Sequence, residues 1–436
     1  MALHAGRWMR SVAAGALSVL VIAGGQVSMA SPSSAASSQA SPRGSLVGTL
    51  SAATIGMKQT SVSAPFNAST DSCPPAAPSR TGPQGRSCLA VEPAPPAQGT
   101  EKPASKAAVA AGEGVCSLAG AGSWWYQRFS SCLREARTTF THWNDKGAVV
   151  GTGVLVVTTS MTLNATSTTW NELVTVKLES ATGDVTRLDV GFDVTCDSQC
   201  TATAPTPWAG QRSLGIGEQV SGQVTYSENL PAGSIDDKIT TKYHMFVTMA
   251  GVQPTQPNAN WSNGRLIRCD NAVGQYPGCV YPDIRANLVL PLSQYGAAAA
   301  TYAWAIQNMS DHWGATDNPL QRMKGEDLAK ANRRVTCEDG TFSPVAAVTD
   351  DSCDEYPFAG TYQGGHTGCA DIVPQLENGQ WMFYSVKGRP DVTKYEPCVR
   401  GHVPLTQNSA AGGKYGSFVQ TDRVLDAEKF VVSVTS

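Results

Sequence analysis

The sequence predicts a multi-domain protein in which an all-β module of antiparallel strands precedes a smaller α+β domain. Three observations support this prediction. The chain has 436 residues, which is room for about two or three domains with a sizeable core. Residues 141–251 contain short runs of β-branched residues that alternate with polar ones, punctuated by Gly, Asp and Asn, as in an antiparallel β-sandwich. Residues 292–308 instead repeat Ala, aromatic and aliphatic residues at helical spacing.

The first 30 residues have the features of a secretory signal peptide. Arg7 and Arg10 form a basic start, residues 12–24 are an apolar run, and small residues flank Met29 at a cleavage site before Ser31. The apolar run is shorter than the roughly 20 residues that span a bilayer, and no later stretch qualifies as a transmembrane helix. We therefore predict a secreted, extracellular protein with no membrane contact in its mature form.

Residues 31–112 are rich in Ala, Ser, Pro, Gly and Thr and poor in large apolar side chains. Such a segment buries too little surface to offset the entropy lost on ordering, so we predict a disordered linker or a pro-segment. Cys73 and Cys88 within it can close a small local loop. Two roles stay open at this point, a flexible spacer and a pro-region that masks the rest of the protein.

Residues 113–262 are predicted to form a β-rich accessory module, in which Trp124 and Trp125 are expected to pack inside. A connector rich in Pro and Asn, residues 253–260, leads to the C-terminal domain at residues 263–436. Strands of the module are expected at residues 153–159, 173–178, 187–192, 219–226 and 243–249. In the C-terminal domain we expect helices at residues 294–309, 325–332 and 410–420, and strands from residue 353 and at 381–386 and 430–434.

Cysteine content indicates an oxidising compartment, because the chain has twelve cysteines, an even number, and no pair with the spacing of a zinc site. Sequence alone does not determine how they pair, and pairing between neighbours in the chain is the simplest arrangement. It gives the bridges Cys73–Cys88, Cys116–Cys132, Cys196–Cys200, Cys269–Cys279, Cys337–Cys353 and Cys369–Cys398.

Charge provides little guidance to partners, because the net charge is only −3 and the chain lacks the basic field of a non-specific nucleic-acid binder. Any contact with nucleic acid must therefore be local. The densest basic run contains Arg333 and Arg334, with Arg322, Lys324 and Lys330 nearby. A guanidinium binds phosphate through two donors, but a solvated helix face explains the same run.

One stretch combines residue types that can carry chemistry, the acidic pair Asp354 and Glu355 between Cys353 and Tyr356-Pro357. Proline keeps the preceding Tyr356 extended. Adjacent acids repel each other unless a cation or a shared proton lies nearby. An Asn oxygen from another element, such as Asn408, can complete a cation site because hard divalent cations prefer oxygen ligands. A solvated turn is the structural alternative for an Asp-Glu pair.

These motifs resemble the secreted NucA/NucB-type deoxyribonuclease family. The resemblance rests on the sequences CDEYPFA from Cys353, QNSAAGG from Gln407 and RVLD from Arg423, and it starts near Ile267 with RCDN and GCV. It implies a fold like a ββα metal finger, in which Asp354 is the general base and Asn408 holds Mg²⁺ or Mn²⁺. Asn408 also suits the N-cap of the last helix.

For three further sets of residues, the resemblance does not decide between alternative roles or alternative residues. Glu355 either reaches the metal or orients a neighbouring basic residue, and Arg333 or Arg334 neutralises phosphate. His366 and Gln407 are accessory candidates, although a loop histidine more often has no role.

The function expected from the resemblance is metal-dependent, weakly sequence-specific endonucleolytic hydrolysis of extracellular DNA. Two alternatives stay open, a non-catalytic binding or surface protein with a degenerate nuclease domain, and a nuclease toxin with a dedicated inhibitor or immunity protein. The sequence offers no support for a serine hydrolase, because it contains no G-x-S-x-G motif.

Overall fold

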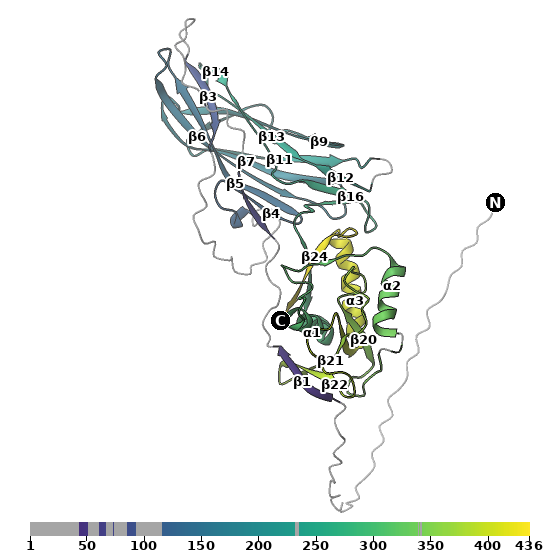
Figure 1. Cartoon of the computed structure of the whole chain (residues 1–436). Helices are drawn as coiled ribbons and strands as arrows, with labels where there is room; N and C mark the ends of the chain where they lie inside the picture. The colour runs from purple at the N-terminus through teal and green to yellow at the C-terminus, as the bar shows by residue number, and fades with distance from the viewer. Residues whose placement is uncertain are drawn as a thin grey trace, which may run out of the picture. The chain divides into compact units, whose positions relative to one another are not determined.

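The computed structural model describes residues 43–50, 61–66, 73, 85–92, 116–231, 235–338, 340 and 342–436. The predicted signal peptide lies outside these residues. No helix in the described part is long and apolar enough to cross a membrane. The described chain has an N-terminal region of mostly antiparallel β-sheets and a C-terminal α+β region, which confirms the predicted fold class (Figure 1).

The N-terminal region contains one large sheet, one small sheet and a further sheet of three strands, paired antiparallel except between β14 and β3. The large sheet runs in the order β14 (Gln253–Gln256), β3 (Arg86–Val91), β5 (Ser130–Trp143), β6 (Val149–Thr162), β7 (Thr169–Gly183), β11 (Gln219–Glu228) and β9 (Cys200–Ala204), with β4 (Ser123–Gln127) beside β5 and β2 (Val62–Pro65) beside β4. The small sheet runs in the order β10 (Arg212–Gly215), β8 (Arg187–Cys196), β13 (Thr241–Thr248) and β15 (Asn258–Ser262).

The alternation seen in the sequence determines which side chains form the first hydrophobic core. On β7, Val174, Val176 and Leu178 are fully buried, and the residues between them are more exposed. Because side chains alternate across a strand, one face of each sheet is apolar and the two faces pack together. Trp124 lies in this core, as expected, and stacks on Tyr126 with ring centroids 5.6 Å apart.

The C-terminal region combines two sheets with three helices. The larger sheet runs in the order β1 (Arg43–Leu50), β22 (Gln380–Val386), β21 (Ala370–Glu377), β23 (Val399–Pro404) and β20 (Asp351–Tyr356). The smaller sheet runs in the order β18 (Ala286–Pro291), β24 (Lys429–Thr435) and β19 (Leu320–Gln321). The helices are α1 (Leu292–Asn308), α2 (Glu326–Arg333) and α3 (Leu405–Thr421).

Helix α1 is the centre of the second hydrophobic core, because almost every residue from Tyr295 to Ile306 is buried. It contacts α3 and several strands, including β20 and β23. Gly296 interrupts the helix with a φ of 49°, a conformation that glycine adopts readily. The side-chain oxygen of Gln407, on α3, accepts a hydrogen bond from Ala297 N–H at 2.6 Å. This bond gives a partner to the backbone N–H that follows the break in α1.

A ββα unit is present as the resemblance implies. Strands β20 and β23 pair antiparallel, and α3 begins directly after β23. The hairpin of β21 and β22 is inserted between the two strands in sequence, and β21 joins the same sheet beside β23. The long segment between Asp354 and Asn408 therefore adds strands to the sheet and does not separate β20 from α3.

Two predictions about connecting segments are wrong. Residues 253–260, expected to be a connector, contribute to strands β14 and β15. The described parts of residues 31–112, expected to be disordered, include strands β1, β2 and β3. Pairing with strands that are distant in the sequence stabilises these segments, and local composition does not reveal such partners.

Residues after the predicted domain boundary at residue 263 still pack in the N-terminal β-sheet region. Strands β16 (Ile267–Asp270) and β17 (Gly278–Val280) pair with each other and with β12 (Asp236–Ile239). Ile267, Cys269 and Cys279 belong to the first core.

The RCDN and RVLD motifs meet through a buried ion pair rather than through a reactive site. Arg423 Nη2 lies 2.5 Å from Asp270 Oδ1, and both side chains are almost completely buried. Arg268 pairs with Glu428 at 2.8 Å. Removing one partner would leave an uncompensated buried charge, so these motif residues have a structural role.

All six disulfides pair neighbouring cysteines as expected.

We expect strand β1 to be required for the stability of the C-terminal region. Leu50 is 3% exposed and belongs to the second core, whereas Leu46 on the same strand is 50% exposed. Leu50→Ala should therefore lower the free energy of unfolding by about 2–5 kcal/mol, and Leu46→Ala by less than about 0.5 kcal/mol. Urea unfolding followed by fluorescence measures both. Equal effects of the two substitutions would show that this segment is the dispensable linker that its composition predicted.

Candidate active site

Strand β20 places its two adjacent acids on opposite faces of the sheet, because successive side chains along a strand point to opposite sides. Asp354 pairs in register with Gly401 of β23, and a Cβ atom at Gly401 would lie 2.5 Å from Thr301 Oγ1 of α1. The face that carries Asp354 is therefore packed closely against α1. Glu355 points to the other face, toward α2 and the turn that follows it.

Asp354 is a buried carboxyl group with one paired and one unpaired oxygen. The residue is 4% exposed, and its Oδ1 accepts a hydrogen bond from the Tyr302 hydroxyl at 2.8 Å. Its Oδ2 is buried and has no hydrogen-bond partner among the described residues. A buried carboxylate oxygen without a partner requires an explanation, and a catalytic role or a bound water or ion is the usual one.

Burial raises the pKa of Asp354 well above its ordinary value of 3.8, and the negative charge of Glu355 raises it further. The Tyr302 hydrogen bond and the positive charge of Arg333 act in the opposite direction. Desolvation dominates because the charged form loses more hydration than the neutral form. The folded protein therefore holds a proton on Asp354 at pH values where a solvated Asp is ionised, and the ionised form is a stronger base than usual.

Asn408 lies beside Asp354 because its side chain is anchored to the same strand. Its Nδ2 donates hydrogen bonds to the Cys353 carbonyl at 2.8 Å and to Ser352 Oγ at 3.2 Å. The amide oxygen, Oδ1, accepts no hydrogen bond from any described residue. The expectation that Asn408 is an N-cap is wrong, since α3 begins three residues earlier and Pro404 occupies the N-cap position.

The residues present fit a divalent cation, although the protein supplies few ligands. Asn408 Oδ1 is an oxygen acceptor without a partner in the described structure, and the carboxyl group of Asp354 lies on the neighbouring strand. Mg²⁺ prefers such oxygens and keeps several of its waters, so one or two protein ligands are sufficient. A cluster of three or more His, Cys, Asp or Glu side chains suited to a metal does not occur within the described ranges.

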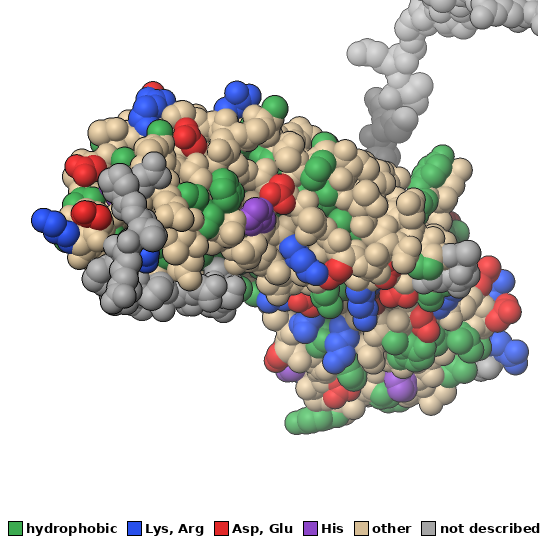
Figure 2. All heavy atoms as spheres, turned by 90° about the horizontal axis from the view of Figure 1, so that it is seen from above, with side chains coloured by type: hydrophobic (Ala, Val, Ile, Leu, Met, Phe, Trp, Pro, Cys, Tyr) green, Lys and Arg blue, Asp and Glu red, His purple; other side chains and the backbone are tan. Residues whose placement is uncertain are grey.

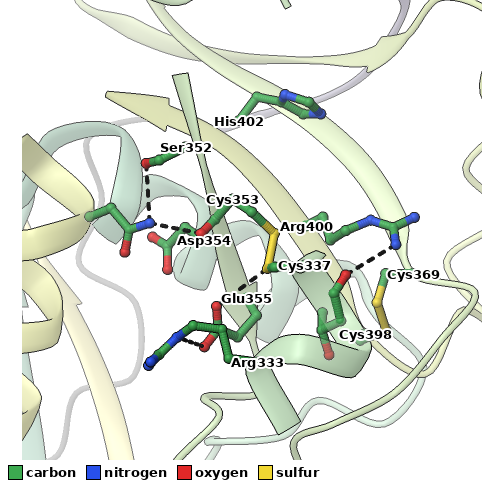
Figure 3. The surroundings of a disulfide bond; sticks show 12 residues. Arg333, Cys337, Ser352, Cys353, Asp354, Glu355, Cys369, Cys398, Arg400 and His402 are labelled. Carbon is green, nitrogen blue, oxygen red and sulfur yellow. Dashed lines mark hydrogen bonds and ion pairs between the residues drawn. A yellow bond between two sulfur atoms is a disulfide. The ribbon is translucent and has the colours of Figure 1, made fainter. Parts of the chain in front are cut away.

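Glu355 pairs with a basic residue, which agrees with the second of its two expected roles. Its Oε1 lies 3.4 Å from Arg333 Nε, and its side chain is 10% exposed while that of Arg333 is 52% exposed. Figure 3 shows the guanidinium of Arg333 directed away from β20 beyond Glu355. Burial raises the pKa of Glu355, and Arg333 lowers it in part. Glu355 thus holds one edge of a guanidinium whose remainder is exposed.

The disulfide Cys337–Cys353 fixes α2 next to β20. Cys337 lies in the π-helical turn Arg334–Glu338 that follows α2, and Cys353 immediately precedes Asp354 (Figure 3). The bridge therefore limits the distance between Arg333 and the acidic pair.

The remaining candidates occupy different positions. Arg334 is exposed on the π-helical turn. His366 is exposed in a loop, and its backbone carbonyl accepts a hydrogen bond from the Thr336 hydroxyl at 3.1 Å. Gln407 does not join the site as an accessory, because its side-chain oxygen is already bonded to Ala297 N–H of α1.

Sequence reasoning missed Tyr302 and a buried network behind β20. His402 Nδ1 lies 2.8 Å from Asp351 Oδ2, and Arg400 makes two contacts of 2.8 and 3.0 Å to Asp371. In Figure 3, His402 lies above the acidic pair and Arg400 to its right. These residues stand singly in the sequence, with no spacing that indicates a common site, and only the pairing of β20, β23 and β21 brings them together.

The fold and the site define a small α+β domain with an acid on the first strand of a ββα unit and an amide on its helix. The family model described as Deoxyribonuclease NucA/NucB matches residues 302–386. This segment includes Tyr302, Arg333, Asp354 and Glu355, and it ends before Asn408. The C-terminal part of the chain therefore carries a NucA/NucB domain, which confirms the resemblance.

Other comparisons add little. A search of curated proteins finds no match. Among solved structures, the native conformation of E. coli alpha-2-macroglobulin is similar at 8% identity, with a TM-score of 0.19. The similarity covers 32% of this chain and 9% of that one.

The raised pKa of Asp354 predicts a measurable loss of stability with pH. The unfolded chain ionises this group near pH 3.8, whereas the folded protein keeps the proton to higher pH. The contribution of protonated Asp354 to the free energy of unfolding is therefore fully present below pH 3.8. It is lost as the pH rises through the pKa that Asp354 has in the folded protein. Asp354→Asn removes this loss, so its free energy of unfolding should increase relative to the wild type as the pH rises above about 4.

Urea unfolding at a series of pH values measures the difference. Asp391→Asn is the matched control, since Asp391 is exposed in the loop before β23. A difference between wild type and Asp354→Asn that is constant with pH would contradict the raised pKa.

Proposed function

We propose that this protein is a secreted, metal-dependent endonuclease that hydrolyses DNA with little sequence specificity. The observation that carries the proposal is that the amide of Asn408 is hydrogen-bonded to Cys353, the residue before Asp354, and that Asp354 Oδ2 is buried without a partner in the described structure. The NucA/NucB match over residues 302–386 supports DNA as the substrate. A degenerate domain would have no reason to keep the cost of a buried, unpaired carboxyl group.

Asp354 is proposed as the general base that takes the proton from the attacking water. A base is most effective when its pKa lies near the working pH, and burial moves the pKa of this carboxyl group in that direction. Tyr302 positions the base, because its hydroxyl fixes Oδ1 at 2.8 Å and leaves Oδ2 as the oxygen that can receive a proton.

Asn408 is proposed to hold the divalent cation through Oδ1. When bound, Mg²⁺ or Mn²⁺ would supply charge neutralisation at the phosphate and at the leaving oxygen. The Asn408 amide is well placed for this role because two hydrogen bonds to β20 fix its rotamer, so the oxygen is oriented before a ligand arrives.

Arg333 is proposed to bind the phosphate. Glu355 contacts its Nε at 3.4 Å, and about half of the side chain is exposed to solvent. A guanidinium held in this way can present its outer N–H groups to phosphate oxygens. Arg334, exposed on the following turn, is the second candidate for phosphate contact.

Weak sequence preference follows from the charge distribution. The net charge is −3, and the face shown in Figure 2 has basic side chains interspersed with acidic and apolar ones. Binding through a few phosphate contacts positions the backbone of DNA but does not read its bases.

The protein is proposed to act outside the cell. All twelve cysteines are paired in six disulfides, which persist in oxidising compartments. Residues 1–30 would be the signal peptide, and the N-terminal β-sheet region would be the accessory module of the C-terminal nuclease domain.

The direct test is cleavage of plasmid DNA by the oxidised protein in Mg²⁺ or Mn²⁺, with EDTA as the metal-free control. Loss of a general base costs about 100- to 10,000-fold in rate, so Asp354→Asn should lower nicking by that factor. Asp391→Asn should cleave like the wild type. Undiminished cleavage by folded Asp354→Asn would refute the assigned base, and wild-type protein without metal-dependent cleavage would favour the non-catalytic alternative.

A further inference from the structure

A cavity of about 330 Å³ lies at one end of the large sheet of the N-terminal region. Its lining residues come from three neighbouring segments, namely Phe129 before β5, Thr162 at the end of β6, and the loop and first residues of β7 that follow. This volume lies at the lower end of the range for small-molecule sites, roughly 300–1,000 Å³. It suits one small ligand or one unit of a longer chain.

The loop that forms one wall is held in place by backbone hydrogen bonds. Leu163 N–H donates to the Phe129 carbonyl at 2.8 Å, and Cys279 N–H donates to the Asn164 carbonyl at 2.8 Å. The Ala165 carbonyl accepts from Arg423 Nη1 at 2.7 Å. The loop is therefore fixed from both sides, so the cavity is pre-formed and its polar side chains have defined positions.

The lining has no charged group. It consists of Phe129, Thr162, Leu163, Asn164, Ala165, Thr169, Trp170 and Asn171.

The nearest cation by sequence, Arg128, is not available to a ligand. Its guanidinium donates to the carbonyls of Asp422, Ile284 and Arg423 and pairs with Glu428 at 2.6 Å. A nucleotide phosphate in this cavity would therefore find no positive partner, although phosphate binding normally requires one. The lining of the cavity therefore differs from a DNA-binding surface in having no charged side chain.

The polar groups of the wall are arranged as donors. Asn164 Oδ1 accepts from Thr166 N–H at 2.9 Å, and Asn171 Oδ1 accepts from Thr225 Oγ1 at 2.9 Å. Each amide therefore keeps its NH₂ group for another acceptor. One aromatic residue supplies an apolar surface, the half-buried Phe129, while Trp170 lies in the hydrophobic core below, where its ring stacks on Tyr226 at 5.5 Å.

We propose that this cavity binds a neutral sugar, one hexopyranose unit of an oligosaccharide. A pyranose ring has an apolar C–H face that packs on an aromatic ring, and its oxygens accept hydrogen bonds from amide NH₂ groups. A nucleobase also has a flat face and hydrogen-bonding edges, but in DNA it is accompanied by phosphates that this wall does not accommodate. The inference is independent of the nuclease function, because the pocket borders the first hydrophobic core, whereas Asp354 and Asn408 lie in the C-terminal region.

The test is calorimetric titration of the full-length oxidised protein with maltotriose, cellotriose and N,N′,N″-triacetylchitotriose, with thymidine monophosphate as a separate arm. At least one trisaccharide should bind. Asn171→Ala removes one amide donor and should weaken that binding about tenfold. Phe129→Leu keeps the apolar volume but removes the ring, and it should weaken binding to a similar extent.

Asn258→Ala is the matched control. Asn258 is exposed on β15, and its amide oxygen is 2.8 Å from His244 Nε2, so the same kind of group is removed away from the cavity. This variant should bind sugar like the wild type, and all three variants should cleave DNA like the wild type. The proposal is overturned if none of the trisaccharides binds at about 10 mM, if Asn171→Ala and Asn258→Ala bind equally, or if thymidine monophosphate binds and Asn171→Ala weakens it.

Discussion

The hydrogen bond from Asn408 Nδ2 to the Cys353 carbonyl is the interaction on which the proposed active site depends. It joins the first turn of α3 to the strand that carries Asp354, and it orients the amide oxygen at the same time. Antiparallel pairing alone would place β20 beside β23 but would not fix the rotation of α3. Because α3 follows β23 without a loop, this bond sets the rotation of the helix over the strand pair.

Two covalent or buried restraints reinforce that arrangement. The bridge Cys337–Cys353 holds the segment of Arg333 on the opposite side of β20. In the same sheet, His402 of β23 contacts Asp351 of β20, and Arg400 of β23 contacts Asp371 of β21. These buried polar contacts join the three strands. A network of this kind specifies one register, since a shift by one residue would leave each of these groups unpaired in the interior. Asp354 and Glu355 thus keep their separate faces.

The sequence was sufficient to indicate candidate site residues but not their surroundings. The CDEYPFA motif and Asn408 are recognisable because their residue types and order are specific, and period-two alternation revealed the module strands. Strand β1 could not be predicted, because its stabilisation comes from β22, which lies more than 300 residues away in the chain. Tyr302 was missed for a similar reason. Inside an apolar helix it resembles a core residue, and only tertiary structure brings its hydroxyl to Asp354.

The most direct test of the proposed site is anomalous diffraction from crystals soaked in Mn²⁺ and measured near the manganese absorption edge. The structure predicts one strong peak about 2.1 Å from Asn408 Oδ1, on the side that faces Asp354. A peak coordinated by Glu355 on the opposite face of β20, or crystals with no peak beside Asn408, would contradict it.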